Sequence, residues 1–385
     1  MEKVSSRRKK TKHEPLTAKV ERVGVKRKIE RKSVRFSRFK RRALKHLWLV
    51  RVGLLVGVFL LVFVVITLVG AAIKRTEVGS YVSLVTNFIF TPSDKVNALQ
   101  GRTNVLVLGK GGKGHEAPDL TDTIIFASIR HSDPSLTLIS LSRDIWVPEL
   151  RAKLNSTYYW GEQKQEGGGL ILAKSTVEKI VGTPVHYGFI IDFSGFTEII
   201  DVMGGIDVEV GRAFTDELYP VAGREEDECD GDTEYKCRYV TVGFEKGVQV
   251  MDGETALKFV RSRNAEGEEG TDMARAKRQQ KVLVATREKA VSLRILLNPK
   301  KILSILSILG DSIETDIDPS AAAILTRRVF SAKENIYSEV LSEDLLENPP
   351  KSFRYDNLYV FIPKDETWGD VQEWVECVLE NGGCD

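Results

Sequence analysis

Residues 103–109 read Thr103-Asn104-Val105-Leu106-Val107-Leu108-Gly109, an apolar run of strand length that stops at a glycine. Residues 123–129 and 136–141 form two more such runs, and the sequence His-Ser-Asp-Pro-Ser at 131–135 lies between them. Short apolar runs separated by turn-forming residues predict β-strands. These three segments therefore predict the beginning of a β-sheet.

Segments with helical spacing alternate with strand-like segments in the next part of the chain. Asn155 is predicted to cap a helix. The predicted helices cover residues 170–181, 197–203, 252–259 and 272–293, and the predicted strands cover residues 185–193 and 206–210. Such alternation predicts an α/β fold, in which helices pack on the faces of a sheet. Residues 211–247 interrupt the pattern as a long, polar, cysteine-bearing excursion.

The last part of the chain, residues 296–385, carries further helical patterns and an apolar run at 358–362 that predicts a late strand. The pattern is compatible with two arrangements. This segment either extends the same sheet or forms a small second lobe.

Residues 52–73 are an uncharged apolar run of 22 residues. As a helix they would be about 33 Å long, enough to cross a bilayer core of about 30 Å. A buried helix of a soluble protein is the simpler reading, but uncharged runs of this length seldom have that origin. A cleaved signal peptide is a second alternative, with Gly70-Ala71-Ala72 as its cleavage site; its apolar region would be shorter and its basic region smaller. We interpret the run as an uncleaved transmembrane helix.

Charge is divided sharply along the chain. Residues 1–51 hold 20 Lys and Arg against 4 Asp and Glu, a net +16, whereas residues 52–385 carry a net −14. Basic residues stay on the cytoplasmic side of a membrane span. The sequence therefore predicts a disordered cytoplasmic tail over 1–51 that attracts anionic lipids, a membrane-proximal connector over 74–100 and a folded body outside the membrane. Nucleic acid is not an expected partner, because no binding motif accompanies the basic tail.

The four cysteines form two close pairs in the sequence: Cys229 with Cys237, and Cys377 with Cys384. Two local disulfides in an oxidising exterior are the favoured interpretation. A zinc site is the alternative, although neither spacing is Cys-x-x-Cys and no histidine lies near either pair. Four cysteines allow three pairings, so the spacing leaves the connectivity open.

A glycine-rich segment, residues 109–114, follows the first predicted strand and carries Lys110 and Lys113. Glycines let backbone N–H groups approach an anion, and lysines supply positive charge. Asp119 and Asp122 follow closely, and carboxylates beside a phosphate site suit Mg²⁺. A flexible loop with solvated aspartates is the ordinary alternative. The segment matches neither a P-loop nor a dinucleotide-binding fingerprint.

Arginines recur at the ends of predicted elements. Arg143 and Asp144 follow the strand that ends at residue 141, where the arginine is suited to bidentate phosphate contact or to a local ion pair. If residues 260–263 are extended, Arg261 and Arg263 project to the same side. On the helix that follows, one third of the circumference holds four polar residues: Asp272, Arg275, Arg278 and Gln279. Exposed arginines on a polar face are the simpler reading, but in an acidic body their concentration favours a clamp for a polyanion.

The order of short motifs along the chain resembles the LytR-CpsA-Psr family. The resemblance covers about residues 101–295 and rests on the ensemble rather than on any single piece. The motifs are Asn-Val-Leu-Val-Leu-Gly at 104–109, Thr-Asp-Thr at 121–123, Ser-Leu-Ser-Arg-Asp at 140–144, Lys-Leu-Asn at 153–155, Met-Gly-Gly-Ile-Asp-Val at 203–208, Gly-Glu-Thr-Ala-Leu at 253–257, Arg-Ser-Arg at 261–263 and Asp-x-x-Arg-x-x-Arg-Gln-Gln at 272–280.

The resemblance implies an α-β-α domain with a mixed central sheet, preceded by one transmembrane helix. It also implies an enzyme that moves a glycopolymer from a polyprenyl pyrophosphate carrier onto peptidoglycan, with Mg²⁺ as cofactor. By motif match, Asp122 would bind the metal, and Arg143, Arg261, Arg263 and Arg278 would contact the pyrophosphate. Gln279, Arg275 and Asp144 would assist, and the polyprenyl chain would lie in an apolar tunnel.

Two positions depart from the family pattern. Gly111 stands where the family commonly has an aspartate, and Leu120 where it has an arginine. Asp119 is a candidate for the missing metal ligand, and Lys110 or Lys113 for the missing cation. Two other functions therefore stay open beside the transferase: a non-catalytic scaffold that binds polyprenyl phosphate, and a polyprenyl pyrophosphate hydrolase.

Overall fold

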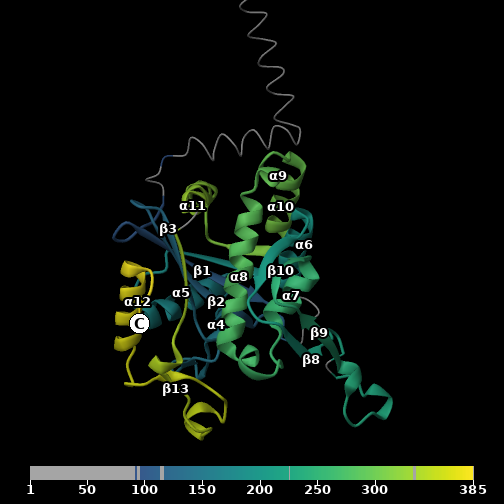
Figure 1. Ribbon diagram of the computed structural model, residues 1–385. Coiled ribbons are helices and arrows are strands. Elements are labelled where there is room, and N and C mark those ends of the chain that lie inside the picture. Colours follow the sequence, from purple (N-terminus) through teal and green to yellow (C-terminus); the bar gives the residue numbers. More distant parts are fainter. Residues whose placement is uncertain (1–91, 93–95, 113–116, 225, 333–334, 385) are drawn as a thin grey trace, which may run out of the picture. The chain divides into compact units, whose positions relative to one another are not determined.

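The computed structural model describes residues 92, 96–112, 117–224, 226–332 and 335–384 (Figure 1). The chain divides into two compact units, residues 1–76 and 77–385, and every described residue belongs to the second. The predicted tail and transmembrane helix, and most of the predicted connector, therefore lie outside the described residues. Among the helices that the structure describes, none has both the length and the apolar character needed to span a bilayer.

A six-stranded mixed sheet forms the centre of the second unit. Its strands, in spatial order, are β11 (Ile313–Thr315), β6 (Tyr187–Asp192), β1 (Arg102–Lys110), β2 (Thr121–Arg130), β3 (Ser135–Ser140) and β12 (Ile336–Val340). β1 runs antiparallel to β2 and parallel to β6, with Val105 opposite Ala127 and Tyr187 respectively. The strands predicted over 103–109, 123–129, 136–141 and 185–193 are confirmed, as is the α/β fold.

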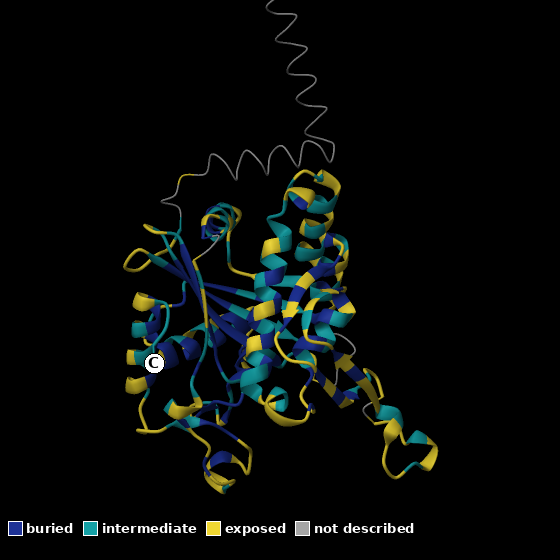
Figure 2. Ribbon diagram, in the orientation of Figure 1, coloured by how far each residue is buried: buried dark blue, intermediate teal, exposed yellow. Residues whose placement is uncertain are grey.

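Helices cover both faces of this sheet, and the alternation along β1 shows why. Leu106 and Leu108 pack on one face with α5 (Gly168–Val181) and α12 (Gly369–Asn381). Val105 and Val107 point to the opposite face, toward α8 (Asp272–Ala290) and α11 (Pro319–Ser331). Because side chains alternate along a strand, a continuous apolar run supplies two cores at once. Figure 2 shows the central strands dark and the outer helix surfaces exposed.

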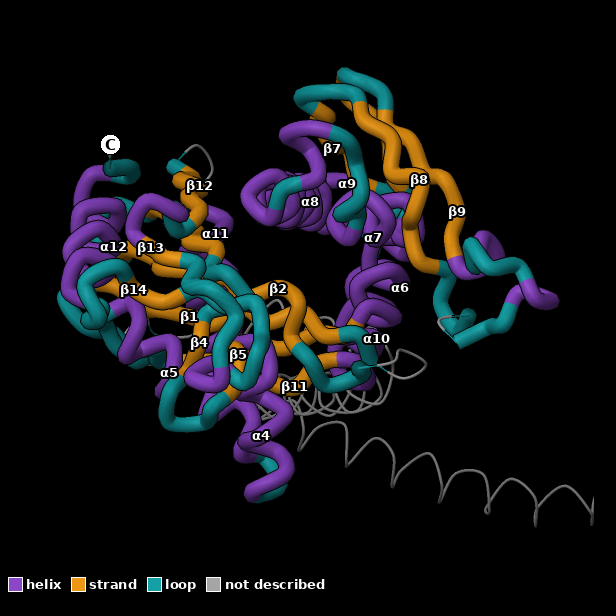
Figure 3. Tube along the Cα trace, turned by 90° about the horizontal axis from the view of Figure 1, so that it is seen from below, coloured by secondary structure: helices purple, strands orange, loops and turns teal. Residues whose placement is uncertain are grey.

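A second cluster of apolar side chains lies beyond α8. It joins α6 (Phe193–Met203), α7 (Gly253–Arg261) and α8 to the strand pairs β7 (Ile206–Val210) with β10 (Gly247–Met251) and β8 (Phe214–Pro220) with β9 (Tyr239–Phe244). Figure 3 shows β7 on the far side of α8 from the central sheet. The polar, cysteine-bearing excursion predicted over residues 211–247 thus contains the antiparallel β8–β9 hairpin.

The remaining elements are short or lie at the edges. They are β4 (Trp146–Val147), β5 (Ala152–Lys153), α4 (Thr157–Lys164), α9 (Leu293–Leu296), α10 (Pro299–Ser312), β13 (Leu346–Glu347), β14 (Ile362–Pro363) and the 3₁₀ turns Leu154–Ser156, Cys229–Gly231, Lys236–Arg238, Gly267–Gly270, Glu343–Leu345 and Phe353–Tyr355. Two local predictions are wrong. Asn155 lies inside a 3₁₀ turn and Ser156 is the residue that precedes α4. Of residues 358–362, only Ile362 belongs to a strand.

The C-terminal segment, residues 296–385, extends the central sheet. It supplies both edge strands, β11 and β12, and the helices α11 and α12 that cover opposite faces. Both local disulfides are present, Cys229–Cys237 at the end of the β8–β9 hairpin and Cys377–Cys384 at the end of α12. The structure therefore selects one of the two arrangements and one of the three cysteine pairings that the sequence left open.

Candidate active site

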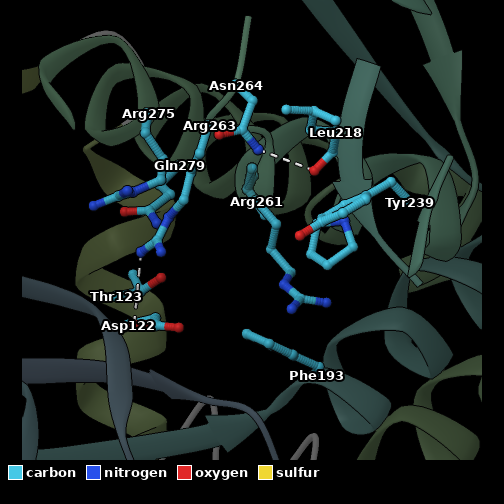
Figure 4. A pocket seen from close by; sticks show the side chains of 12 residues that line it. Asp122, Thr123, Phe193, Leu218, Tyr239, Arg261, Arg263, Asn264, Arg275 and Gln279 are labelled. Carbon is cyan, nitrogen blue, oxygen red and sulfur yellow. Dashed lines mark hydrogen bonds and ion pairs between the residues drawn. The ribbon is translucent and has the colours of Figure 1, made fainter. Parts of the chain in front are cut away.

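A cavity of about 260 Å³ opens where the start of β2, the end of α7 and the first half of α8 come together (Figure 4). Most of its lining side chains are polar or cationic. They are Asp122, Thr123, Phe193, Leu218, Pro220, Tyr239, Val260, Arg261, Arg263, Asn264, Arg275 and Gln279. A smaller adjoining pocket of about 40 Å³ adds Arg143 and shares Asp122, Arg275 and Gln279. We refer to the predicted residues that the two pockets bring together as the arginine site: Asp122, Arg143, Arg261, Arg263, Arg275 and Gln279.

Asp122 is the anionic centre of the arginine site. Its Oδ1 accepts a hydrogen bond from Arg143 Nη1 and lies 3.8 Å from Arg263 Nη2. Burial would raise the pKa of Asp122, but the charges of Arg143 and Arg263 outweigh that effect and hold the pKa below its usual value. Asp122 is therefore ionised at neutral pH and fixes two of the surrounding arginines.

Arg143 is positioned by groups that lie outside the cavity. Its Nε is 3.4 Å from Asp144 Oδ2, and the other oxygen of that carboxylate accepts a hydrogen bond from Lys153 Nζ at 2.6 Å. Asp144 is only 4% exposed, so it supports Arg143 without lining either pocket. Lys153 had no chemical role in the sequence analysis, because nothing in the sequence indicates that it reaches Asp144.

Arg261 and Arg263 reach the cavity by a different route from the one predicted. Residues 260–263 are not all extended, because α7 continues to Arg261 and the chain leaves the helix only at Ser262. The guanidinium of Arg261 lies 4.8 Å from the centre of the Phe193 ring and 5.8 Å from that of Tyr219. Figure 4 shows Arg263 directed at Asp122 and Arg261 above Phe193. The change of backbone direction at Ser262 thus lets both arginines line one cavity.

Asp216, on β8, holds the main chain of this arginine-bearing segment. It is completely buried, and its Oδ2 accepts hydrogen bonds from the backbone N–H groups of Arg263 at 2.9 Å and Asn264 at 3.2 Å. Its Oδ1 accepts a third from Leu218 N at 3.0 Å. A buried carboxylate with three N–H partners is satisfied and rigid. Asp216 was not among the predicted site residues, because nothing in the polar excursion over 211–247 indicates that this carboxylate is buried.

Arg278 is not brought into the arginine site. Only 3% exposed, it donates from Nε to Phe259 O at 3.0 Å and from Nη2 to Ser262 O at 2.6 Å. Its Nη1 donates to the main-chain and carboxylate oxygens of Glu269 at 2.8 and 2.9 Å. Its hydrogen bonds thus tie α8 to the segment between α7 and α8, directly behind Arg263. The structure gives Arg278 a supporting position and leaves Arg275 facing the cavity.

The cations of the arginine site crowd one another. Arg275 pairs with Asp272 at 2.6 Å, near the start of α8, which Thr271 caps by accepting a hydrogen bond from Ala274 N. Burial, together with the charge of Arg143, lowers the pKa of Arg275. Burial and the charges of Arg275 and Arg143 lower the pKa of Arg263 to about 10. Arg263 and Arg275 therefore stay charged at neutral pH at an electrostatic cost, and a bound polyanion would relieve the repulsion on them.

Lys110 and Asp119 pair with each other instead of joining the arginine site. Lys110 Nζ lies 3.1 Å from Asp119 Oδ1 and 4.8 Å from the centre of the Tyr158 ring. Neither residue lines the two polar pockets. Lys113 lies outside the described residues. Lys110 was a candidate for the missing cation, and Asp119 was the candidate for the missing metal ligand. In the structure the two form an ion pair with each other at the end of β1.

Of the two predicted metal ligands, Asp122 is the one that lines the polar cavity. Mg²⁺ is usually held by one or two carboxylates together with substrate phosphates and water. In the described part of the chain, both cations that contact Asp122 do so through Oδ1, so Oδ2 can serve as a ligand. The same part contains one cluster of three potential ligands, Asp227, Cys229 and Cys237, and its cysteines form a disulfide.

An apolar cavity continues from the arginine site along α8. It has a volume of about 310 Å³ and shares Thr123, Phe193, Val260 and Gln279 with the polar cavity. A further apolar cavity of about 360 Å³ shares four other residues with it: Val107, Phe189, Leu283 and Ala290. The two lie between the sheet and helices α6, α8, α10 and α11. A cationic site thus opens at one end of a long apolar space.

The fold and these cavities define an α/β protein in which a cavity lined by arginines adjoins a long apolar space. The chain belongs to the LytR-CpsA-Psr family, since the model of that family (LytR_cpsA_psr) matches residues 80–374. The match begins before the first described strand and runs into α12.

Two relatives carry the same name, polyisoprenyl-teichoic acid–peptidoglycan teichoic acid transferase TagU. The protein from Oceanobacillus iheyensis is 26% identical over 291 residues, which span 73% of this chain and 82% of the relative. The protein from Halalkalibacterium halodurans is 23% identical over 282 residues, which span 72% and 79%. The chain is therefore a distant homologue of teichoic acid transferases.

Solved structures share the fold at lower sequence identity. Bacillus subtilis TagV aligns with a TM-score of 0.51 and 22% identity, over 74% of this chain and 99% of TagV. TagT bound to LIIa-WTA aligns with a TM-score of 0.51 and 20% identity, over 74% of this chain and 95% of TagT. These likenesses support the architecture described above.

Proposed function

We propose that this protein transfers a glycopolymer from a polyprenyl pyrophosphate carrier to a cell-wall acceptor, peptidoglycan by analogy with its relatives. One observation carries the proposal: the polar cavity that holds the arginine site shares Thr123, Phe193, Val260 and Gln279 with the apolar cavity. A lipid pyrophosphate has the matching chemistry, two linked phosphates at the end of a long apolar chain. The pyrophosphate would lie among the arginines and the polyprenyl chain along α8.

The arginines supply the electrostatic part of the reaction. Arg143, Arg263 and Arg275 surround the space beside Asp122, and Arg261 approaches from the end of α7. Fixed cations stabilise charge that develops on a leaving phosphate, and a site held by protein contacts needs little reorganisation. Arg278 and Asp216 act as positioning residues, because they fix the segment that carries Arg263.

In the proposed transfer, a hydroxyl oxygen of the acceptor attacks the phosphorus that bears the polymer. The bond from that phosphorus to the bridging oxygen breaks, and its electron pair leaves with polyprenyl phosphate. The hydroxyl proton passes to a carboxylate or phosphate oxygen at the site. Mg²⁺ bound at Asp122 would add positive charge at the phosphates. Asp119 would contribute to the metal site only if its pair with Lys110 opened.

The test is incubation of the full-length chain with a polyprenyl pyrophosphate glycolipid, Mg²⁺ and peptidoglycan fragments, followed by separation of the products. The proposal predicts polymer linked to peptidoglycan together with polyprenyl phosphate. Free phosphorylated polymer would favour the hydrolase, and tightly bound but unchanged glycolipid would favour the scaffold. Either of these results, obtained with every acceptor offered, rules the transferase out.

A further inference from the structure

The short helix α9 and the residue that follows it present two leucines to solvent beyond the end of α8. Leu293 is 72% exposed and Leu297 is 76% exposed, whereas Ile295 between them is 2% exposed and belongs to the apolar cluster beyond α8. Residues four apart on a helix share a face and residues two apart do not. Ile295 therefore fixes α9 to the body, and the two leucines project together from the outer side. We call residues 293–300 the α9 tip.

The α9 tip is basic in an otherwise acidic body. Residues 293–300 contain two basic residues, Arg294 and Lys300, and no Asp or Glu, although the chain after residue 51 carries a net −14. Arg294 and Lys300 are exposed beside the leucines. Lys301, by contrast, donates to Met203 O at 3.0 Å and so belongs to the body of the protein. Apolar side chains flanked by basic ones are the combination that binds an anionic bilayer surface.

The α9 tip also lies next to the far end of the apolar space. Ala290, the last residue of α8, lines both apolar cavities, and Val291 lines the second. Gln279 borders the arginine site on the same helix, so the distance along α8 from Gln279 to Ala290 is about 16 Å at 1.5 Å per residue. The apolar space thus extends from the arginine site to the base of the α9 tip, at the top of α8 in Figure 1.

We propose that the α9 tip docks on an anionic lipid bilayer, with Leu293 and Leu297 inserted among the lipids and Arg294 and Lys300 at the headgroups. Single exposed leucines are common on soluble proteins and need no explanation. Here the paired leucines, the local positive charge and the adjoining apolar cavity all favour the same partner, an anionic lipid bilayer. Docking would place the end of the apolar cavity at the membrane, so that the polyprenyl chain of the proposed substrate could enter the cavity directly from the bilayer.

The contact can be measured without any catalysis, on the full-length chain in nanodiscs of phosphatidylglycerol and phosphatidylcholine. The four cysteines pair with each other, so Leu297→Cys introduces one free thiol for a nitroxide label. Phe353→Cys is the matched control, because Phe353 is also apolar and is 87% exposed. It follows β13, which lies at the opposite end of the unit from α9 in Figure 1.

We expect the label at 297 to collide more often with oxygen, which dissolves in lipid, than with a water-soluble nickel complex. The label at 353 should show the reverse, and Leu293→Cys should behave like 297. Equal access of the nickel complex to 297 and 353 would overturn the docking proposal. Low access of both reagents at 297 would also overturn it, since that result indicates a protein contact instead.

A second measurement connects the α9 tip to the substrate, and this part rests on the proposed function. The double variant Leu293→Glu/Leu297→Glu should lose transfer from a long-chain donor embedded in a bilayer while keeping transfer from a short-chain, water-soluble donor. Phe353→Glu should affect neither. Equal loss with both donors contradicts the docking role. If wild-type protein transfers nothing from either donor, the proposed function fails while the labelling result stands.

Discussion

Arg275 and Arg278 lie three residues apart on α8, and the structure predicts opposite consequences for removing them. Arg278→Ala deletes a buried guanidinium with four hydrogen bonds to Phe259, Ser262 and Glu269. Removing one partner of a buried ion pair costs about 3–5 kcal/mol. The Glu269 side chain is 23% exposed and can turn toward water, so we expect the lower end, about 3 kcal/mol. For a unit of this size that corresponds to a fall in Tm of roughly 5–10 °C.

Arg275→Ala should leave stability almost unchanged. The ion pair of Arg275 with Asp272 spans one helical turn, and such pairs contribute about 0.2–0.5 kcal/mol. Its removal also relieves the repulsion between Arg275 and Arg143, which contributes to the lowered pKa of Arg275. Because Arg275 lines both polar pockets, turnover should fall by about 10²–10³-fold, as for other groups that stabilise transition-state charge.

Both variants can be compared in one preparation of full-length protein. Thermal unfolding followed by circular dichroism gives Tm, and the initial rate of glycolipid transfer, measured well below both Tm values, gives activity. The reasoning is refuted if Arg278→Ala keeps the wild-type Tm and loses turnover, because Arg278 would then contact the substrate. It is equally refuted if Arg275→Ala unfolds.

Three further predictions concern the carboxylates. Asp216→Asn should raise the KM for the glycolipid and lower stability by about 1–3 kcal/mol, because the amide has one acceptor oxygen where the carboxylate uses two. Its NH2 group then faces either Leu218 N or the N–H groups of Arg263 and Asn264; a KM equal to wild type would show that Arg263 does not need this support. The pKa of Asp122 is depressed in the folded state, so its contribution to stability is present above about pH 4 and disappears as the pH falls through the folded pKa. The free energy of unfolding, measured with urea between about pH 3 and 6, should therefore depend less on pH for Asp122→Asn than for wild type; equal pH dependence would contradict this. Asp122→Asn should raise the Mg²⁺ concentration needed for half-maximal transfer more than Asp119→Ala does, since Asp119 pairs with Lys110; the opposite order would make Asp119 the principal metal ligand.

Four of the six strands of the central sheet, β1, β2, β3 and β6, were predictable from composition, whereas the edge strands β11 and β12 were not predicted. The apolar runs at 103–109, 123–129 and 136–141 are long, uncharged and bounded by turn residues, and each became a strand buried on both faces. The β8–β9 hairpin was not predictable in this way. Its β8 strand reads Phe-Thr-Asp-Glu-Leu-Tyr-Pro, and Asp216 occupies a buried position where a period-two pattern would need an apolar residue.

In the candidate site, too, some features could be predicted from the sequence and others could not. Spacing on a helix places Arg275 and Arg278 near one face, but it does not indicate that the segment between α7 and α8 passes over Arg278 and buries it. The contact of Lys153 with Asp144 spans β4 and β5, and no local rule of sequence specifies such a contact. Sequence reasoning therefore found the residues that could meet an anion, and the tertiary structure separates those that face the cavity from those that support them.

The most direct test of the central claim is to follow the origin of oxygen in the reaction. Full-length protein would be given the polyprenyl pyrophosphate glycolipid, Mg²⁺ and peptidoglycan fragments in water enriched in oxygen-18, and the phosphate of the released polymer would be analysed by mass spectrometry. Attack by an acceptor hydroxyl predicts a phosphodiester to peptidoglycan that contains no oxygen-18. A polymer phosphate that carries one oxygen-18 atom, with no peptidoglycan attached, would mean that water is the acceptor and would contradict the transferase.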